Sequence, residues 1–305
     1  METRNFLTLE DARHEDLRTV LDLARAHVEG HLSSPLAGKT VCLAFFEAST
    51  RTMISFELAA RRGGADVISL SERSSAIAKG ESLIDTVVTL DRLGADAIVL
   101  RHPATGAATL AARHTGVAVI NAGDGCGQHP TQALLDLYSL SEASGGFDEL
   151  AGRRVAVVGD ILHSRVARSV VPAFRAAGME VALVAPHTLL PLDAGAWGLP
   201  NLSSVDEALD WGARVLYVLR LQRERMTGAR VPSVAEYARF YGVAKRHLRH
   251  GVLIMHPGPV NRGVEISGDV VLDGSSLIPD QVAAGIHVRS AVLALATDAA
   301  HEVAA

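Results

Sequence analysis

Short apolar runs alternate with longer amphipathic segments along most of the chain. In the first half, the apolar runs predict strands at residues 39–46, 66–70, 97–101 and 117–122. The segments between them repeat apolar residues with helical spacing, which predicts helices at residues 55–62, 82–93 and 131–140. Buried strands joined by helical crossovers are typical of a parallel sheet, so the sequence predicts an α/β fold.

The same alternation returns after a turn-rich stretch at residues 144–148. Further strands are predicted at residues 154–159, 180–185, 215–220 and 252–255. We therefore predict two domains, 1–145 and 146–284, each a mostly parallel sheet flanked by helices, with a cleft between them. The last segment, 285–305, carries an Ala-, Val- and Leu-rich helix that is expected to pack back on the first domain with the N-terminal helix.

Composition narrows the class of protein. The chain has 305 residues, of which 48% are hydrophobic and 21% charged, enough for two domains with their own cores. A net charge of -5, without a long Lys/Arg run, argues against nucleic acid or an acidic membrane as the main partner. An anionic ligand would therefore need a local cluster of positive charge.

Two cysteines, Cys42 and Cys126, are too few for a disulfide framework, and we interpret both as free thiols of a reducing compartment. Residues 1–9 contain no apolar signal-peptide core, and no later segment has the apolar length of a membrane span. The cytoplasm is the predicted location.

The segment Ser49-Thr50-Arg51-Thr52 stands where an apolar run gives way to a helical pattern. The first backbone N–H groups of a helix are unpaired and carry partial positive charge. Hydroxyl donors and a planar guanidinium beside them suit a phosphate. A simple helix cap with a solvated arginine fits these four residues equally well.

Further polar residues follow other predicted strands. Arg101 comes directly after one strand and adds a second cation, while Lys79 lies in a polar loop; either alone is more often a surface charge. His129 precedes Pro130, which favours the first turn of a helix, so its imidazole lies beside unpaired N–H groups and is expected to be neutral. Such a ring could donate a hydrogen bond to a carbonyl oxygen, with Gln132 holding an adjacent amide.

Several motifs in the right order make the chain resemble the aspartate/ornithine carbamoyltransferase family, and in particular its aspartate-specific catalytic chains. The motifs are Phe45-Phe46-Glu47, Ser49-Thr50-Arg51-Thr52, Ser55-Phe56-Glu57, Lys79-Gly80-Glu81, Arg101-His102-Pro103, Asn121-Ala122-Gly123-Asp124-Gly125 and His129-Pro130-Thr131-Gln132. The resemblance implies transfer of the carbamoyl group of carbamoyl phosphate to L-aspartate, giving N-carbamoyl-L-aspartate and phosphate in pyrimidine biosynthesis. It implies neither a metal nor an organic cofactor.

The resemblance also implies roles for single residues. The phosphate would be held by Ser49, Thr50, Arg51 and Thr52. The carbonyl oxygen would be bound by Arg101, His129 and Thr52, and the carbamoyl amide by Gln132 and the carbonyl of Pro257, beside Gly258. The two carboxylates of aspartate would be bound by Arg165, Arg220 and Gln222. Thr131 and the Arg220/Gln222 pair favour aspartate, because the ornithine-specific relatives carry cysteine-containing motifs at Thr131 and around Gly258.

In this family a serine and a lysine reach the neighbouring subunit's site, which makes Ser75 and Lys79 their counterparts here and implies a homotrimer with shared sites. Association with a regulatory or dihydroorotase-like chain stays open. Two positions depart from the family: Ala48 replaces a usual proline and Met53 a usual basic residue. We expect a structural effect from these departures rather than loss of activity.

Two other functions were weighed. The run Val155-Ala156-Val157-Val158-Gly159-Asp160 before a helix suggests a nicotinamide-dependent oxidoreductase, but the glycine spacing that a dinucleotide needs does not follow it. A catalytically silent assembly subunit is the second, with Met53 as its only hint. The preferred mechanism is positioning and electrostatic stabilisation without a covalent intermediate, with closure of the two domains as a hypothesis.

Overall fold

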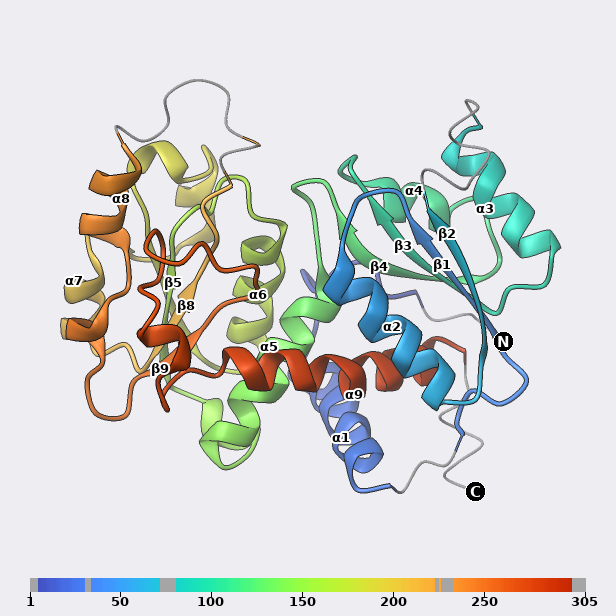
Figure 1. Cartoon of the computed structure of the whole chain (residues 1–305), viewed down its shortest axis with the longest axis horizontal. Coiled ribbons are helices and arrows are strands. Elements are labelled where there is room, and N and C mark those ends of the chain that lie inside the picture. The colour runs from blue at the N-terminus through green and yellow to red at the C-terminus, as the bar shows by residue number, and fades with distance from the viewer. Residues whose placement is uncertain (1–4, 31–33, 72–80, 223–224, 226–232, 298–305) are drawn as a thin grey trace. The chain divides into compact units, whose positions relative to one another are not determined.

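The computed structural model describes residues 5–30, 34–71, 81–222, 225 and 233–297, and it contains two compact units (Figure 1). The first unit comprises residues 1–135 and 282–305, and the second comprises residues 136–281. This division cuts helices α5 (Pro130–Ser144) and α9 (Ile278–Ala296), so each of these helices contributes to both units. The predicted domain bounds, by contrast, follow the turn after α5.

The first unit is built on a parallel sheet with the strand order β2-β1-β3-β4 among the described residues. Its strands are β1 (Thr40–Phe45), β2 (Asp66–Ser71), β3 (Ala97–His102) and β4 (Ala118–Asp124). Its helices, apart from α5 and α9, are α1 (His14–Val28), α2 (Thr50–Arg62), α3 (Leu83–Arg92) and α4 (Ala107–Ala112). All four strands predicted in this half are confirmed.

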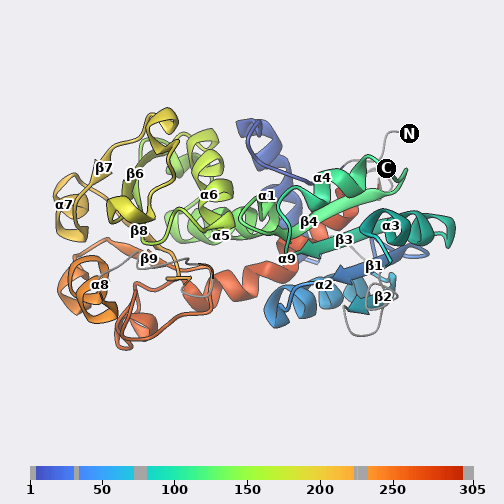
Figure 2. The ribbon, with the colours of Figure 1, turned by 90° about the horizontal axis from the view of Figure 1, so that it is seen from above.

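Successive side chains along the strands of the first unit point to opposite faces of the sheet, and both faces are apolar. Cys42, Ala44 and Phe46 pack in one cluster with residues of α3 and α4. Helix α2 lies on the other side of the strand layer from α3 (Figures 1 and 2). Because parallel strands are covered on both faces, their runs are almost wholly apolar, which is why the sequence pattern located them well.

The second unit is also built on a parallel sheet, with the order β7-β6-β5-β8-β9 among the described residues. Its strands are β5 (Arg154–Val158), β6 (Glu180–Val184), β7 (Asn201–Leu202), β8 (Val215–Val218) and β9 (Leu253–Met255). Its own helices are α6 (Arg165–Ala176), α7 (Val205–Asp210) and α8 (Val234–Tyr241). Helix α7 packs on one face of the sheet, and Phe174 of α6 meets Tyr217 of β8 edge to face at 5.7 Å on the other.

Two of the described helices begin five or more residues earlier than predicted. Helix α2 begins at Thr50 instead of residue 55, and α9 begins at Ile278 instead of residue 285. Both first turns are polar or contain proline, so apolar periodicity alone could not reveal them. None of the described helices is long and apolar enough to span a bilayer.

Candidate active site

The segment Ser49–Thr52 forms the N-terminus of α2, directly after β1. Ser49 is the N-cap residue with extended backbone (φ -161°, ψ 92°), and its hydroxyl does not cap the helix. The unpaired N–H groups of the first turn therefore lie beside three hydroxyl groups. Thr52 is buried, whereas Thr50 and Arg51 are exposed, and desolvation by neighbouring atoms lowers the pKa of Arg51 from its ordinary value. This turn can bind an anion.

Arg101, near the end of β3, is a buried residue (8% exposed). Its Nη1 donates to the carbonyl of Ala122 at 3.0 Å, and its Nε lies 3.3 Å from Oε2 of Glu47. The parallel register pairs Phe45 with Arg101, which places Glu47 next to it. Charge-assisted contacts of this kind fix the direction of the guanidinium. Glu47 was missed as a supporting residue, although its position directly after a predicted strand was a signal.

The loop before His129 is organised by the buried carboxylate of Asp124. Its Oδ1 accepts from Asn121 Nδ2 (3.0 Å) and from the N–H of Gln128 (2.7 Å), and its Oδ2 accepts from the N–H of Gly106 (2.6 Å). This carboxylate therefore ties the end of β4 to the loop after β3. The sequence motif that contains Asp124 did not predict this role.

His129 and Gln132 are both buried at the start of α5. The carbonyl of His129 accepts the N–H of Gln132 at 3.1 Å, so the imidazole stands at the first turn of the helix as predicted. The described site residues of the first unit thus lie at or after the carboxyl ends of parallel strands: Ser49–Thr52 after β1, Arg101 near the end of β3, and His129 and Gln132 after β4. Ligands of such sheets bind at this edge.

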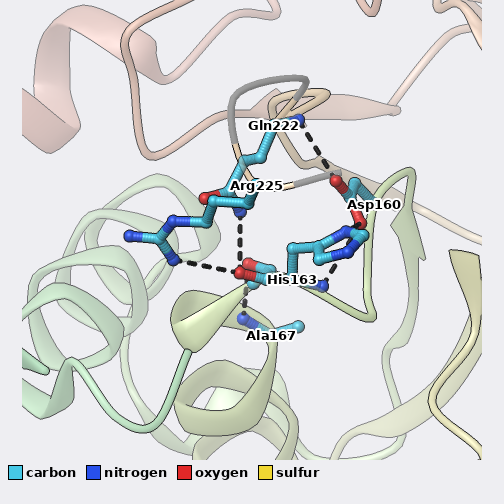
Figure 3. A network of polar contacts seen from close by, with 6 residues as sticks. Asp160, His163, Ala167, Gln222 and Arg225 are labelled. Carbon is cyan, nitrogen blue, oxygen red and sulfur yellow. Dashed lines mark hydrogen bonds and ion pairs between the residues drawn. The ribbon is translucent and has the colours of Figure 1, made fainter. Parts of the chain in front are cut away.

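In the second unit, Asp160 joins the β5–α6 loop to the segment after β8 (Figure 3). Its Oδ1 lies 2.8 Å from Nδ1 of His163, and its Oδ2 accepts the N–H of Gln222 at 3.1 Å. The carbonyl of His163 accepts from Nε2 of Gln222 (3.1 Å) and from Nη1 of Arg225 (3.2 Å). These contacts bring Gln222 to the loop that leads into α6. Neither Asp160 nor His163 was predicted to have this role.

Arg165 is the first residue of α6 and is buried, while Arg220 is half-buried two residues after β8. Ser164 caps α6 by accepting the N–H of Ala167 at 3.1 Å. Gly159 allows the close approach of the two segments: a Cβ there would lie 2.9 Å from the carbonyl oxygen of Leu219. The two arginines therefore follow adjacent strands, since β5 pairs with β8.

The turn after β9 carries Pro257 and Gly258, both half-buried. His256 is buried, and its Nδ1 accepts the N–H of Gly258 at 2.8 Å. Its backbone N–H donates to Oε1 of Gln281 at 3.0 Å. The predicted site residues Ser75 and Lys79 lie outside the described residues. Of the two departures, Ala48 is exposed before α2 and Met53 is half-buried within it.

The nicotinamide alternative loses support here. The segment after β5 contains a single glycine, and the carboxylate of Asp160 is directed at His163 and at the backbone of Gln222. A dinucleotide site would need further glycines for approach of a pyrophosphate.

Comparison with known proteins gives matches along the whole chain. Residues 4–142 match the carbamoyl phosphate-binding domain, and residues 151–296 the Asp/Orn-binding domain, of aspartate/ornithine carbamoyltransferase. The aspartate carbamoyltransferase catalytic subunit of Rubrobacter xylanophilus is 78% identical over 305 residues, covering all of both chains. The catalytic subunit of M. jannaschii aspartate transcarbamoylase is 37% identical, with a TM-score of 0.81 over 96% of this chain and 97% of that one. Trypanosoma cruzi aspartate transcarbamoylase, solved with carbamoyl aspartate and phosphate, is 29% identical, with a TM-score of 0.85 over 96% of each chain. The chain belongs to the aspartate/ornithine carbamoyltransferase family.

Proposed function

We propose that this chain transfers the carbamoyl group of carbamoyl phosphate to the amine of L-aspartate, giving N-carbamoyl-L-aspartate and phosphate. The observation that carries the proposal is the 78% identity, without length difference, to an aspartate carbamoyltransferase catalytic subunit. The sheet edges of both units carry the cations and hydroxyl groups that this chemistry needs.

In the proposed reaction, the N-terminal turn of α2 binds the phosphate through Ser49, Thr50, Arg51 and Thr52. Arg101, His129 and Thr52 bind the carbonyl oxygen. This oxygen gains negative charge when the amine attacks, and donors that are already in place stabilise such charge without reorganisation. The contacts of Arg101 with Glu47 and Ala122 supply that preorganisation.

Gln132 and the carbonyl of Pro257 hold the carbamoyl amide in this proposal, next to Gly258. Arg165 takes the α-carboxylate of aspartate, and Arg220 with Gln222 takes the side-chain carboxylate. The uncharged amine attacks the carbamoyl carbon, and phosphate then departs against Arg51 and Lys79. No covalent intermediate is invoked, since burial raises the pKa of the Cys42 thiol to about 11, which keeps the thiol protonated at neutral pH.

The family resemblance further supports a homotrimer in which Ser75 and Lys79 complete a neighbouring site, and a place in pyrimidine biosynthesis. Free thiols at Cys42 and Cys126 suit a cytoplasmic enzyme. The mass of the assembly in solution, measured by light scattering, tests the trimer.

The decisive experiment is phosphate release from carbamoyl phosphate with L-aspartate, L-ornithine or no acceptor. We expect release with aspartate alone, together with formation of carbamoyl aspartate. Release with ornithine would overturn the choice of acceptor. No phosphate release with either acceptor would overturn the proposed enzyme activity in favour of an assembly subunit.

A further inference from the structure

A chain of buried polar side chains ends on the backbone of the turn that carries Pro257. Gln281, in the first turn of α9, accepts the N–H of His256 on its Oε1 at 3.0 Å. Its Nε2 donates to Oδ1 of Asp136 at 2.6 Å, and the hydroxyl of Tyr217 donates to Oδ2 of the same carboxylate at 2.5 Å. All four residues are at most 3% exposed. The contacts join α5, β8, β9 and α9 within the second unit.

Asp136 fixes which way the Gln281 amide points. An ionised carboxylate only accepts hydrogen bonds, so the amide must turn its nitrogen to Asp136 and its oxygen to the N–H of His256. Burial, together with the Asp136 charge, raises the pKa of Tyr217 well above 10, which keeps its hydroxyl protonated as a donor. The orientation of Gln281 is therefore determined by chemistry as well as by packing.

The ring of His256 fixes the other end of the turn. Since its Nδ1 accepts the N–H of Gly258, its proton must be on Nε2, which lies 3.4 Å from Oε1 of the buried Glu265. The peptide groups on both sides of Pro257 are thus held by side chains. A turn restrained on both sides can keep one carbonyl directed at one place.

A buried carboxylate is a costly way to stabilise a fold, because apolar side chains of the same volume often do so equally well. The hydrogen bonds of Tyr217, Asp136 and Gln281 add a fixed orientation of the backbone at the Pro257 turn. Asp136 also lies four residues after Gln132 on α5, about one helical turn, and so on the same side of that helix. Gln132 is the other residue proposed to hold the carbamoyl amide.

We infer that Gln281 is a positioning residue for carbamoyl phosphate: through the backbone of His256 it holds the Pro257 carbonyl where the carbamoyl amide binds. The inference rests on the proposed function. It requires that Gln281 affect a ligand that carries the amide and leave ligands without it unaffected.

The test compares three ligands in a Gln281→Met variant, in which an unbranched side chain of similar length loses the amide. We expect the KM for carbamoyl phosphate to rise about tenfold, the value of one well-placed hydrogen bond. Inhibition by inorganic phosphate, which has no amide, should keep its wild-type constant. Inhibition by succinate at saturating carbamoyl phosphate, a probe of the aspartate side, should also stay unchanged.

A Gln281→Glu variant tests the orienting role separately from packing, because it changes the pH dependence of the KM for carbamoyl phosphate. It keeps the acceptor for His256 but places a second carboxylate against Asp136. Two adjacent carboxylates raise the pKa of one of them, so the pair shares a proton at low pH and repels once that proton is lost. The KM for carbamoyl phosphate should therefore increase more from pH 6 to pH 8 than in the wild type. Val282→Ala, at the exposed neighbouring position, is the matched control and should behave as wild type.

Equal weakening of phosphate, succinate and carbamoyl phosphate in Gln281→Met would overturn the inference and leave Gln281 a stabilising residue only. An unchanged KM for carbamoyl phosphate in both variants would overturn it as well. A wild-type protein that does not use carbamoyl phosphate would instead overturn the proposed function, on which the inference depends.

Discussion

At the scale of single residues, Arg51 and Arg101 carry the same charge in opposite settings. Arg101 is buried and held by Glu47 and by the carbonyl of Ala122. Arg51 is exposed on the first turn of α2. A fixed guanidinium suits an oxygen that gains charge in place, whereas an exposed one can follow a phosphate as it leaves.

Replacing Arg51 tests the second of these roles. In Arg51→Ala we expect kcat to fall by about 10²–10³, the usual effect of removing one group that stabilises transition-state charge. Because the side chain is exposed, the melting temperature should change little. Steady-state kinetics and a thermal melt measure both. Arg61→Ala, at the far end of the same helix, is the control, and wild-type turnover in Arg51→Ala would remove Arg51 from the mechanism.

The residues that support the site were harder to predict than the residues proposed to touch substrate. Asp136 and Gln281 are 145 positions apart, and their contact depends on how α5 and the start of α9 come together. Nothing in the local pattern around either residue indicates a partner. Asp124 and Asp160 were visible as loop carboxylates, but their acceptor roles depend on N–H groups of other loops.

At the scale of elements, apolar periodicity located the buried strands better than it located the polar first turns of helices. The strand predictions from residue 39 to residue 255 are confirmed to within two residues at every end. Helix α4 (Ala107–Ala112) and strand β7 (Asn201–Leu202) were missed, since six and two residues are too short to show a period. Apolar periodicity missed the first turns of α2 and α9, although the segment Ser49–Thr52 was itself interpreted as the start of a helix and holds the candidate phosphate site.

The loop between β4 and α5 offers a test of how an element positions the site. Gly125 has φ +46°, and a Cβ there would lie 2.6 Å from the N–H nitrogen of Thr105 and 2.8 Å from the carbonyl oxygen of Pro103. Gly125→Ala should therefore displace the loop before His129 and cost about 1–3 kcal/mol of stability, with a clear fall in kcat. Denaturant unfolding and steady-state kinetics measure these effects.

Gly152→Ala is the matched control for Gly125→Ala. Gly152 also has positive φ, at +74°, but no heavy atom lies within 4 Å of a Cβ built there. The control should show only the smaller cost of backbone strain and keep its activity. Equal destabilisation by the two variants would show that the close approach of the added Cβ to Thr105 and Pro103 does not contribute to the loss of stability.

At the scale of the whole molecule, histidine burial makes stability depend on pH. Burial lowers the pKa of four described histidines and is the largest cause of the shift in each: His27, His102, His247 and His287. Each prefers to be neutral in the folded protein. The His27 ring on α1 lies 5.7 Å from the His287 ring on α9, centroid to centroid, and the charge of Arg62 further lowers the pKa of both.

These lowered pKa values predict the direction of the pH effect. Above the unfolded pKa of about 6.5, both states hold neutral histidines and stability is complete. As the pH falls below that value, the histidines of the unfolded chain bind protons while those of the folded chain stay neutral, so the free energy of unfolding decreases. The decrease ends once the pH is below the lowered pKa of the folded state. The melting temperature of the wild type should therefore fall between pH 7.5 and pH 5.5. In the His27→Gln/His287→Gln double variant, the melting temperature should fall less over the same range. His250→Gln, an exposed substitution, should keep the wild-type slope. A double variant as steep as the wild type would show that the α1–α9 pair does not contribute to the acid sensitivity of the fold.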